Sequence, residues 1–247
     1  MRRFLIRAVA ALLSLLCAPA LADESTPERL RQSIAGAVVS DPASLQRLLT
    51  RRNVERLSQD EKAELLLELI ERKRLAGLTA AVGAGIDVNA PLIIDREGEP
   101  VSLTPLNYAL GAHVESDVAI RLIDLGANIN LASIDDNPPL LTAIGLRAYP
   151  AIERLLEAGA DPNVADRLIG LTPLMLAVGA PEDHARMLKV AQRLVRRGAD
   201  IQARTTTGHD ALAFARRAGN EMAVAWLLSA GSDSSPEKSP VAPEPDG

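Results

Sequence analysis

One short motif recurs along the chain, and this internal repetition constrains the fold more than any other feature. Gly-Ala-Asp or Gly-Ala-Asn occurs three times, with the looser copies Gly-Ile-Asp before them and Gly-Ser-Asp after them. The five glycines are separated by 41, 33, 39 and 33 residues, and they are Gly85, Gly126, Gly159, Gly198 and Gly231. Repetition at this period indicates stacked structural units, each too small to bury its own apolar face.

Each glycine follows a predicted helix. The positions eight, seven, four and three residues before it are nearly always apolar, as in Val118, Ala119, Leu122 and Ile123. Residues four apart lie on one stripe of an α-helix, and the glycine is free to adopt the left-handed conformation that ends it.

A second, earlier helix is predicted in each unit. Its start is marked by Thr104-Pro105-Leu106, Pro138-Pro139-Leu140 and Thr172-Pro173-Leu174, with Asp210-Ala211-Leu212 as a weaker fourth copy. A threonine hydroxyl accepts a hydrogen bond from a free N–H of the first turn, and proline lacks that N–H. Each unit is therefore a turn, a helix, a short loop, a second helix and a glycine-ended turn, and the fold class is all-α.

These motifs resemble the ankyrin repeat family. The resemblance rests on Leu103-Thr104-Pro105-Leu106, Leu171 to Ala177, Leu155 to Asn163 and Ile86 to Ala90, and it covers about residues 58–231. It implies a helix-turn-helix solenoid with β-turn fingers and about five repeats. The histidine that family members carry after Thr-Pro-Leu is replaced by Asn107, Leu141, Met175 and Ala213, which puts its hydrogen bonds between repeats in doubt.

The two ends of the repeat region should present polar faces, as a solenoid requires. Ser58-Gln59-Asp60-Glu61 is a capping box that starts a helix, and Ser25 to Glu28 and Asp41 to Ala43 each start another. We interpret residues 23–57 as N-terminal capping helices and residues 58–231 as the solenoid. Residues 232–247 are rich in Ser, Pro and acidic residues and are predicted to be a disordered tail.

The first 22 residues have the three parts of a secretory signal peptide. A basic start with Arg2, Arg3 and Arg7 precedes an apolar run that ends at Cys17, and Ala20-Leu21-Ala22 is an A-x-A cleavage site. Cleavage after Ala22 leaves 24 basic and 32 acidic residues, a net charge of −8, and no cysteine. We therefore expect a bacterial protein exported to the periplasm, although secretion beyond the cell stays open.

Two insertions interrupt the period. The first, Pro91 to Ser102, is predicted to form two short strands around a charged turn, an elongated β-finger. The second, Pro181 to Arg186, is predicted to lengthen the loop between two helices. Insertions in repeats fall on surface loops and often mark the binding face. Surface loops also tolerate insertions that have no function.

The sequence offers no catalytic constellation. The three histidines, His113, His184 and His209, are expected to lie too far apart to share a metal, and no GxSxG, HExxH or phosphate-binding loop occurs. We expect no catalytic residues, no metal and no cofactor. The acidic net charge argues against nucleic-acid binding, and no membrane association is expected once the signal peptide has been removed.

The sequence therefore predicts a monomeric, non-enzymatic module that binds another protein, and its mature net charge of −8 fits a basic partner. Two roles are compatible with these features: an accessory factor of a periplasmic enzyme, and an inhibitor or immunity protein against a secreted toxin. The alternative from a different functional class is a hydrolase. Ankyrin relatives bind proteins through turn tips and first helices. Mapped by repeat position, the candidate contacts are Asp95, Arg96, Glu97, Tyr108, Asp135, Asn137, Leu168, Thr206 and His209.

Overall fold

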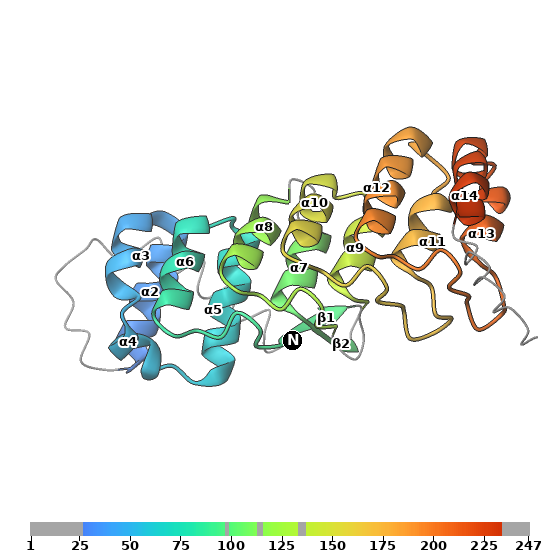
Figure 1. Ribbon diagram of the computed structural model, residues 1–247. Helices are drawn as coiled ribbons and strands as arrows, with labels where there is room; N and C mark the ends of the chain where they lie inside the picture. Colours follow the sequence, from blue (N-terminus) through green and yellow to red (C-terminus); the bar gives the residue numbers. More distant parts are fainter. Residues whose placement is uncertain (1–26, 97–98, 113–115, 133–136, 234–247) are drawn as a thin grey trace, which may run out of the picture. The chain divides into compact units, whose positions relative to one another are not determined.

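The computed structural model describes residues 27–96, 99–112, 116–132 and 137–233. Within these residues the chain forms thirteen α-helices and two β-strands (Figure 1). None of the helices in this part of the chain is long and apolar enough to cross a membrane. Contacts divide the chain into two compact units, Met1–Ala160 and Asp161–Gly247, and each unit is described by itself. The predicted signal peptide, residues 1–22, lies outside the described residues.

The first unit begins with five helices, and the predicted helix starts are confirmed. Asp41 accepts hydrogen bonds from the N–H groups of Ala43 and Ser44, and Ser58 forms the predicted capping box with Glu61. One short helix near Thr50 was not predicted. The helices are α2 (Pro27–Ser40), α3 (Pro42–Leu48), α4 (Arg51–Glu55), α5 (Gln59–Glu71) and α6 (Leu75–Gly83).

Helices α2 and α3 pack against the first helix pair, α5 and α6. Arg31 on α2 forms an ion pair with Glu61 on α5, and the Arg74 guanidinium donates to the carbonyls of Val38 and Val39 at 3.0 and 2.7 Å. Gly77 allows the close approach of these helices, because a Cβ there would lie within 3 Å of the side chains of Leu45 and Leu69.

The rest of the first unit repeats one helix pair, as the sequence periodicity predicts. First helices stack on first helices, α5 on α7 and α7 on α9, while second helices stack as α6 on α8 and α8 on α10. Leu106, Leu122, Leu140 and Ile152 are fully buried between these layers. The helices are α7 (Pro105–Ala112), α8 (Asp117–Asp124), α9 (Pro139–Gly145) and α10 (Tyr149–Glu157).

The second unit contains two further helix pairs of the same kind, with α11 packed on α13 and α12 on α14. The helices are α11 (Pro173–Val178), α12 (His184–Arg196), α13 (Ala211–Arg217) and α14 (Glu221–Asp233). The pairs fit the predicted all-α ankyrin-type solenoid.

Two boundaries in the second unit differ from the prediction. His184, expected in a loop, is the first residue of α12, because the insertion at residues 181–186 extends the helix as well as the loop. Gly231, expected to end a helix, lies inside α14, which continues to Asp233. The described helix therefore extends two residues into the predicted tail, and residues 234–247 lie outside the description.

The turns between helix pairs share one hydrogen-bonding pattern. Four of the five predicted glycines have positive φ angles of 103°, 90°, 89° and 93°, at Gly85, Gly126, Gly159 and Gly198. Two residues after each glycine, an Asp or Asn side chain accepts a hydrogen bond from the N–H two residues further on, as Asp87 does from Asn89 at 2.8 Å. This local bond fixes the turn that follows each helix.

Asparagine side chains connect neighbouring turns. Asn89 Oδ1 accepts a hydrogen bond of 2.7 Å from the N–H of Asn128 in the next turn. In the second unit, Asn163 accepts from the N–H of Asp200 at 2.7 Å and donates to the carbonyl of Gly198 at 2.9 Å. Because the bonded residues are 35 to 39 positions apart, these bonds fix the spacing of successive turns.

Candidate functional site

The predicted β-finger is confirmed. Strands β1 (Leu92–Arg96) and β2 (Glu99–Leu103) pair antiparallel, with Leu92 opposite Leu103 and Arg96 opposite Glu99. Leu92 and Leu103 are buried and anchor the base of the hairpin. The candidate residues Asp95 and Arg96 therefore lie on the strand end remote from this base (Figure 1). Glu97 lies outside the described residues.

One exposed residue of the finger was missed by the sequence analysis. Ile93 is 51% exposed although it is flanked by the buried Leu92 and the half-buried Ile94. Successive side chains of a strand point to opposite faces, so the period of two in a predicted strand was the available signal. The finger thus presents an apolar side chain on one face.

The other candidate residues of the first unit are held by hydrogen bonds between helix pairs. Tyr108 on α7 is half buried, and its hydroxyl donates to Glu71 Oε1 at the end of α5, at 2.9 Å. Asn137 is exposed, and its carbonyl accepts a hydrogen bond of 2.6 Å from Asn107 Nδ2. Tyr108 and Asn137 therefore belong to a fixed surface of the stack. Asp135 lies outside the described residues.

Three candidates in the second unit lie on two turns that are bonded to each other. In the first turn, Asp166 Oδ1 accepts hydrogen bonds from the N–H groups of Ile169 at 3.0 Å and Leu171 at 2.9 Å. The N–H of Thr206, in the second turn, donates to the carbonyl of Ile169 at 2.8 Å. The structure therefore brings Leu168 and Thr206 onto neighbouring turn tips.

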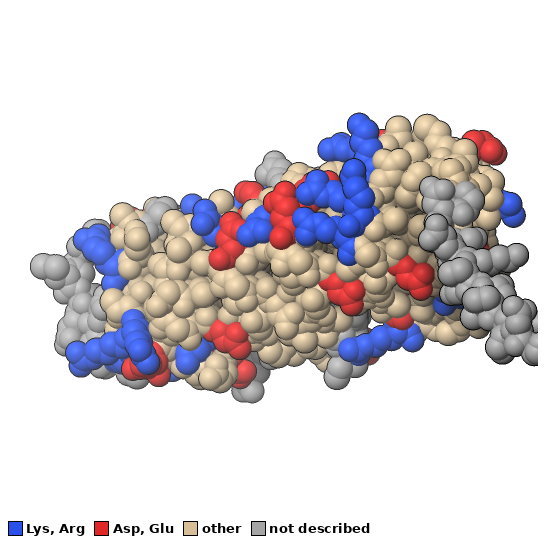
Figure 2. Space-filling view, in the orientation of Figure 1, with Lys and Arg blue, Asp and Glu red and all other residues tan. Residues whose placement is uncertain are grey.

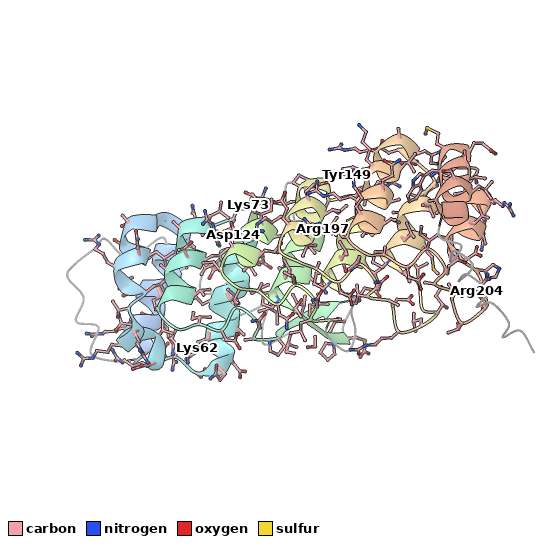
Figure 3. All side chains as sticks on the ribbon, viewed as in Figure 1. Lys62, Lys73, Asp124, Tyr149, Arg197 and Arg204 are labelled. Carbon is pink, nitrogen blue, oxygen red and sulfur yellow. The ribbon has the colours of Figure 1, made fainter. Side chains whose placement is uncertain are left out.

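The second turn is also closed internally. Arg204, labelled in Figure 3, donates to the Gly208 carbonyl at 2.9 Å and forms an ion pair of 3.3 Å with Asp210. The ring of His209 contacts the Thr207 hydroxyl at 2.8 Å, and Thr205 Oγ1 accepts from the His209 N–H. These bonds keep His209, the third candidate, in place on the exposed turn.

Leu168 is the most exposed large apolar residue of this surface. It is 87% exposed at the tip of the first turn, and its neighbour Ile169 is 40% exposed. Two adjacent, exposed apolar residues on an ordered turn offer a partner protein apolar surface that it can bury on binding. We call the surface formed by Leu168, Ile169, Thr206, Thr207 and His209 the turn-tip surface.

The described residues bring no catalytic group together. His209 and Thr207 form a hydroxyl–imidazole contact, but both are exposed on a turn, and the water-excluded environment of a catalytic site is missing there. His184 lies on α12, and His113 lies outside the described residues. Among the described residues, no group of three or more His, Cys, Asp or Glu side chains could hold a metal ion.

Comparison with known proteins agrees with the repeat pattern. Residues 140–238 match the family model described as ankyrin repeats (3 copies). Protein PhlB of Serratia liquefaciens is 35% identical over 89 residues, which are 36% of this chain. The match covers 39% of PhlB, so the chain spans about two fifths of that relative's length. The ankyrin repeats inferred from the sequence are confirmed over residues 140–238.

Proposed function

We propose that this protein is a non-enzymatic module that binds a partner protein through its turn tips and first helices. Ankyrin repeats imply protein–protein interaction, and the family is typically non-enzymatic. The observation that carries the proposal is the 87% exposed Leu168 on a turn held by Asp166 and by the Thr206–Ile169 bond. Such an anchor loses little conformational freedom on binding, because its backbone is already ordered.

We further propose that the module acts in the periplasm as an accessory factor of an enzyme there. The support is the basic, apolar and A-x-A sequence of residues 1–22, with cleavage after Ala22. The mature net charge of −8 favours a basic partner through electrostatic steering. An inhibitor or immunity protein would carry the same features, so the two roles differ only in the effect on the partner's activity.

The proposal is tested by capture of partners on the chain from Asp23 onward, immobilised and exposed to a periplasmic extract. We expect one abundant partner, identified by mass spectrometry. The partner's activity is then measured with and without this protein: an increase indicates an accessory factor and a decrease indicates an inhibitor. The intact mass of the chain purified from the periplasm should equal that of a chain beginning at Asp23. A mass that corresponds to a chain beginning at Met1 would contradict export with cleavage.

The contribution of the β-finger is tested in the same assay. Changing four charged finger residues to serine should weaken capture and leave the melting temperature nearly unchanged, because the charged turn is expected at the surface from the sequence and surface substitutions usually cost within about 0.5 kcal/mol. These residues are Asp95, Arg96, Glu97 and Glu99.

A matched control removes the same number of charges and the same net charge from α4 and α5. It changes Arg51, Glu55, Asp60 and Glu64, all exposed, to serine. Loss of binding in this control together with normal binding of the finger variant would contradict the assignment to the finger.

A further inference from the structure

Helix α12 carries a row of cations that the proposed function does not use. Its sequence, from His184 to Arg196, contains no acidic residue, although the whole chain has a net charge of −5. Four basic residues recur at spacings of three or four on one face of the helix, Arg186, Lys189, Arg193 and Arg196, and Arg197 follows just beyond its end. The opposite face, with Met187, Val190 and Leu194, is buried in the second unit.

The row contrasts with helices α8 and α10 of the first unit, which carry charges of both signs. On α8 and α10, Asp124 and Arg154 form an ion pair of 2.8 Å. On α12, Lys189, Arg196 and Arg197 are exposed, and no ion pair joins them to a carboxylate within the described residues. Arg186 and Arg193 have interactions of their own. Basic side chains gather over the region of α12 in Figure 2.

Helix energetics do not account for the whole row. Cations in the last turn, such as Arg196 and Arg197, are stabilised by the helix dipole. Arg186, in the first turn, is at the end where the dipole disfavours a cation, and Lys189 is in the middle. The insertion at residues 181–186 contributes Arg186 and lengthens α12 to 13 residues, against 8 for α8 and 9 for α10.

We propose that this face of α12, the basic stripe, binds an acidic segment of a protein partner. From Arg186 to Arg197 the stripe extends about 16 Å along the helix, given a rise of about 1.5 Å per residue. An extended segment of about five residues covers that length, and alternate carboxylates would meet successive cations. The stripe and the turn-tip surface consist of different residues, so a partner can be recognised at one without the other.

A protein segment suits the stripe better than a lipid surface. A helix that binds at a membrane interface needs an exposed apolar face to insert, and the large apolar residues Met187, Val190 and Leu194 of α12 are already buried. Attraction of a few cations to anionic lipid is also opposed by the acidic remainder of the chain. A narrow acidic segment can contact the stripe without approaching the other acidic surfaces.

The test uses a fluorescein-labelled peptide of ten consecutive glutamates, with a glutamine peptide of equal length as the uncharged probe. Fluorescence anisotropy is measured with the mature chain at low and high salt. The wild-type chain should bind the glutamate peptide at low salt and release it at high salt, because exposed charges are screened. The combined change Lys189→Ser, Arg196→Ser and Arg197→Ser should weaken binding at least about tenfold.

The matched control removes three exposed cations elsewhere in the same unit, by Arg167→Ser, Arg216→Ser and Arg217→Ser. It should change the affinity less than about twofold. Equal loss in both variants would mean that net charge, not the stripe, binds the peptide, and would overturn the proposal. Binding to phosphatidylglycerol vesicles that only the stripe variant loses, with peptide binding unchanged, would also overturn it. Circular dichroism of both variants checks that the helices are intact.

Discussion

The side-chain amide of Asn107 donates a hydrogen bond of 2.6 Å to the backbone carbonyl of Asn137, thirty residues further along the chain. Asn107 lies on α7 and Asn137 in the loop before α9, so the bond joins consecutive helix pairs. The backbone N–H of Asn107 in turn donates to Thr104 Oγ1 at 3.2 Å. The histidine typical of the family is replaced here, but asparagine also carries a side-chain N–H, and this N–H bonds the next helix pair.

Asn107→Ala should therefore destabilise the first unit by about 1–3 kcal/mol, the cost of a lost hydrogen bond at a buried site. The free energy of unfolding is measured by chemical denaturation. Asn137→Ala is the matched control, because the acceptor is a backbone carbonyl that this change keeps. An equal loss in both variants would show that the bond between helix pairs is not what Asn107 contributes.

Ser116 is predicted to be replaceable by glycine with a gain in stability. It is fully buried, has a φ of 63°, and its hydroxyl finds no partner among the described residues. Glycine removes both the cost of a left-handed backbone, about 1–2 kcal/mol, and the buried hydroxyl. Glycine lowers the free energy of unfolding by only about 0.5–1 kcal/mol through its greater conformational freedom in the unfolded chain. Ser116→Gly should raise the melting temperature.

Ser116→Ala separates the two contributions, because it removes the hydroxyl and retains the left-handed backbone. We expect its melting temperature to lie below that of Ser116→Gly. A melting temperature of Ser116→Gly below that of the wild type would show that the hydroxyl has an important partner.

Stability at acid pH should depend on Asp41. Hydrogen bonds from the Ser44 side chain and then from its backbone N–H hold the pKa of the Asp41 carboxyl below its ordinary value of 3.8. A carboxyl whose pKa is lower in the folded state stabilises the fold above the unfolded pKa, and this contribution is lost as the pH falls through the folded pKa. Asp41→Asn should therefore show a weaker loss of stability below about pH 4 and, as asparagine also caps helices, little change at pH 7.

The measurement is thermal unfolding of both proteins as a function of pH. Glu28→Gln, an exposed change on α2, is the control for general acid sensitivity. Parallel pH profiles for the wild type and Asp41→Asn would contradict the role of Asp41 as an ionised cap.

The sequence predicts the helix starts because their cause is local. The hydroxyl of Thr172 and the carboxylate of Asp210 accept the hydrogen bonds expected of caps, from the N–H groups of Met175 and Ala213. The end of α14 was not predicted correctly, since a glycine such as Gly231 permits but does not force a left-handed turn. The insertion before α12 was misjudged for a similar reason, because loop and helix extension have the same effect on repeat spacing.

The candidate site could be predicted only in part. Repeat position correctly placed Leu168 and Thr206 on turns, but their connection through Ile169 depends on a backbone hydrogen bond between residues 37 positions apart. No sequence motif encodes that bond. Tyr108 is half buried because of tertiary packing, since its hydroxyl reaches Glu71 on the preceding helix pair. This contact could not be predicted from repeat position either.

Two leucines with opposite environments give the last prediction. Leu155 on α10 is fully buried, and Leu168 on the turn tip is 87% exposed. Leu155→Ala should lower the free energy of unfolding by about 2–5 kcal/mol, because it leaves a cavity between stacked helices. Leu168→Ala should change stability by less than about 0.5 kcal/mol and yet weaken capture of the partner by about tenfold, since an anchor is buried only in the complex. Stability is measured by denaturation and binding by titration of the captured partner. Normal binding by Leu168→Ala would remove the turn-tip surface from the proposed interface, whereas a stable Leu155→Ala would mean that the stack tolerates a cavity at its centre.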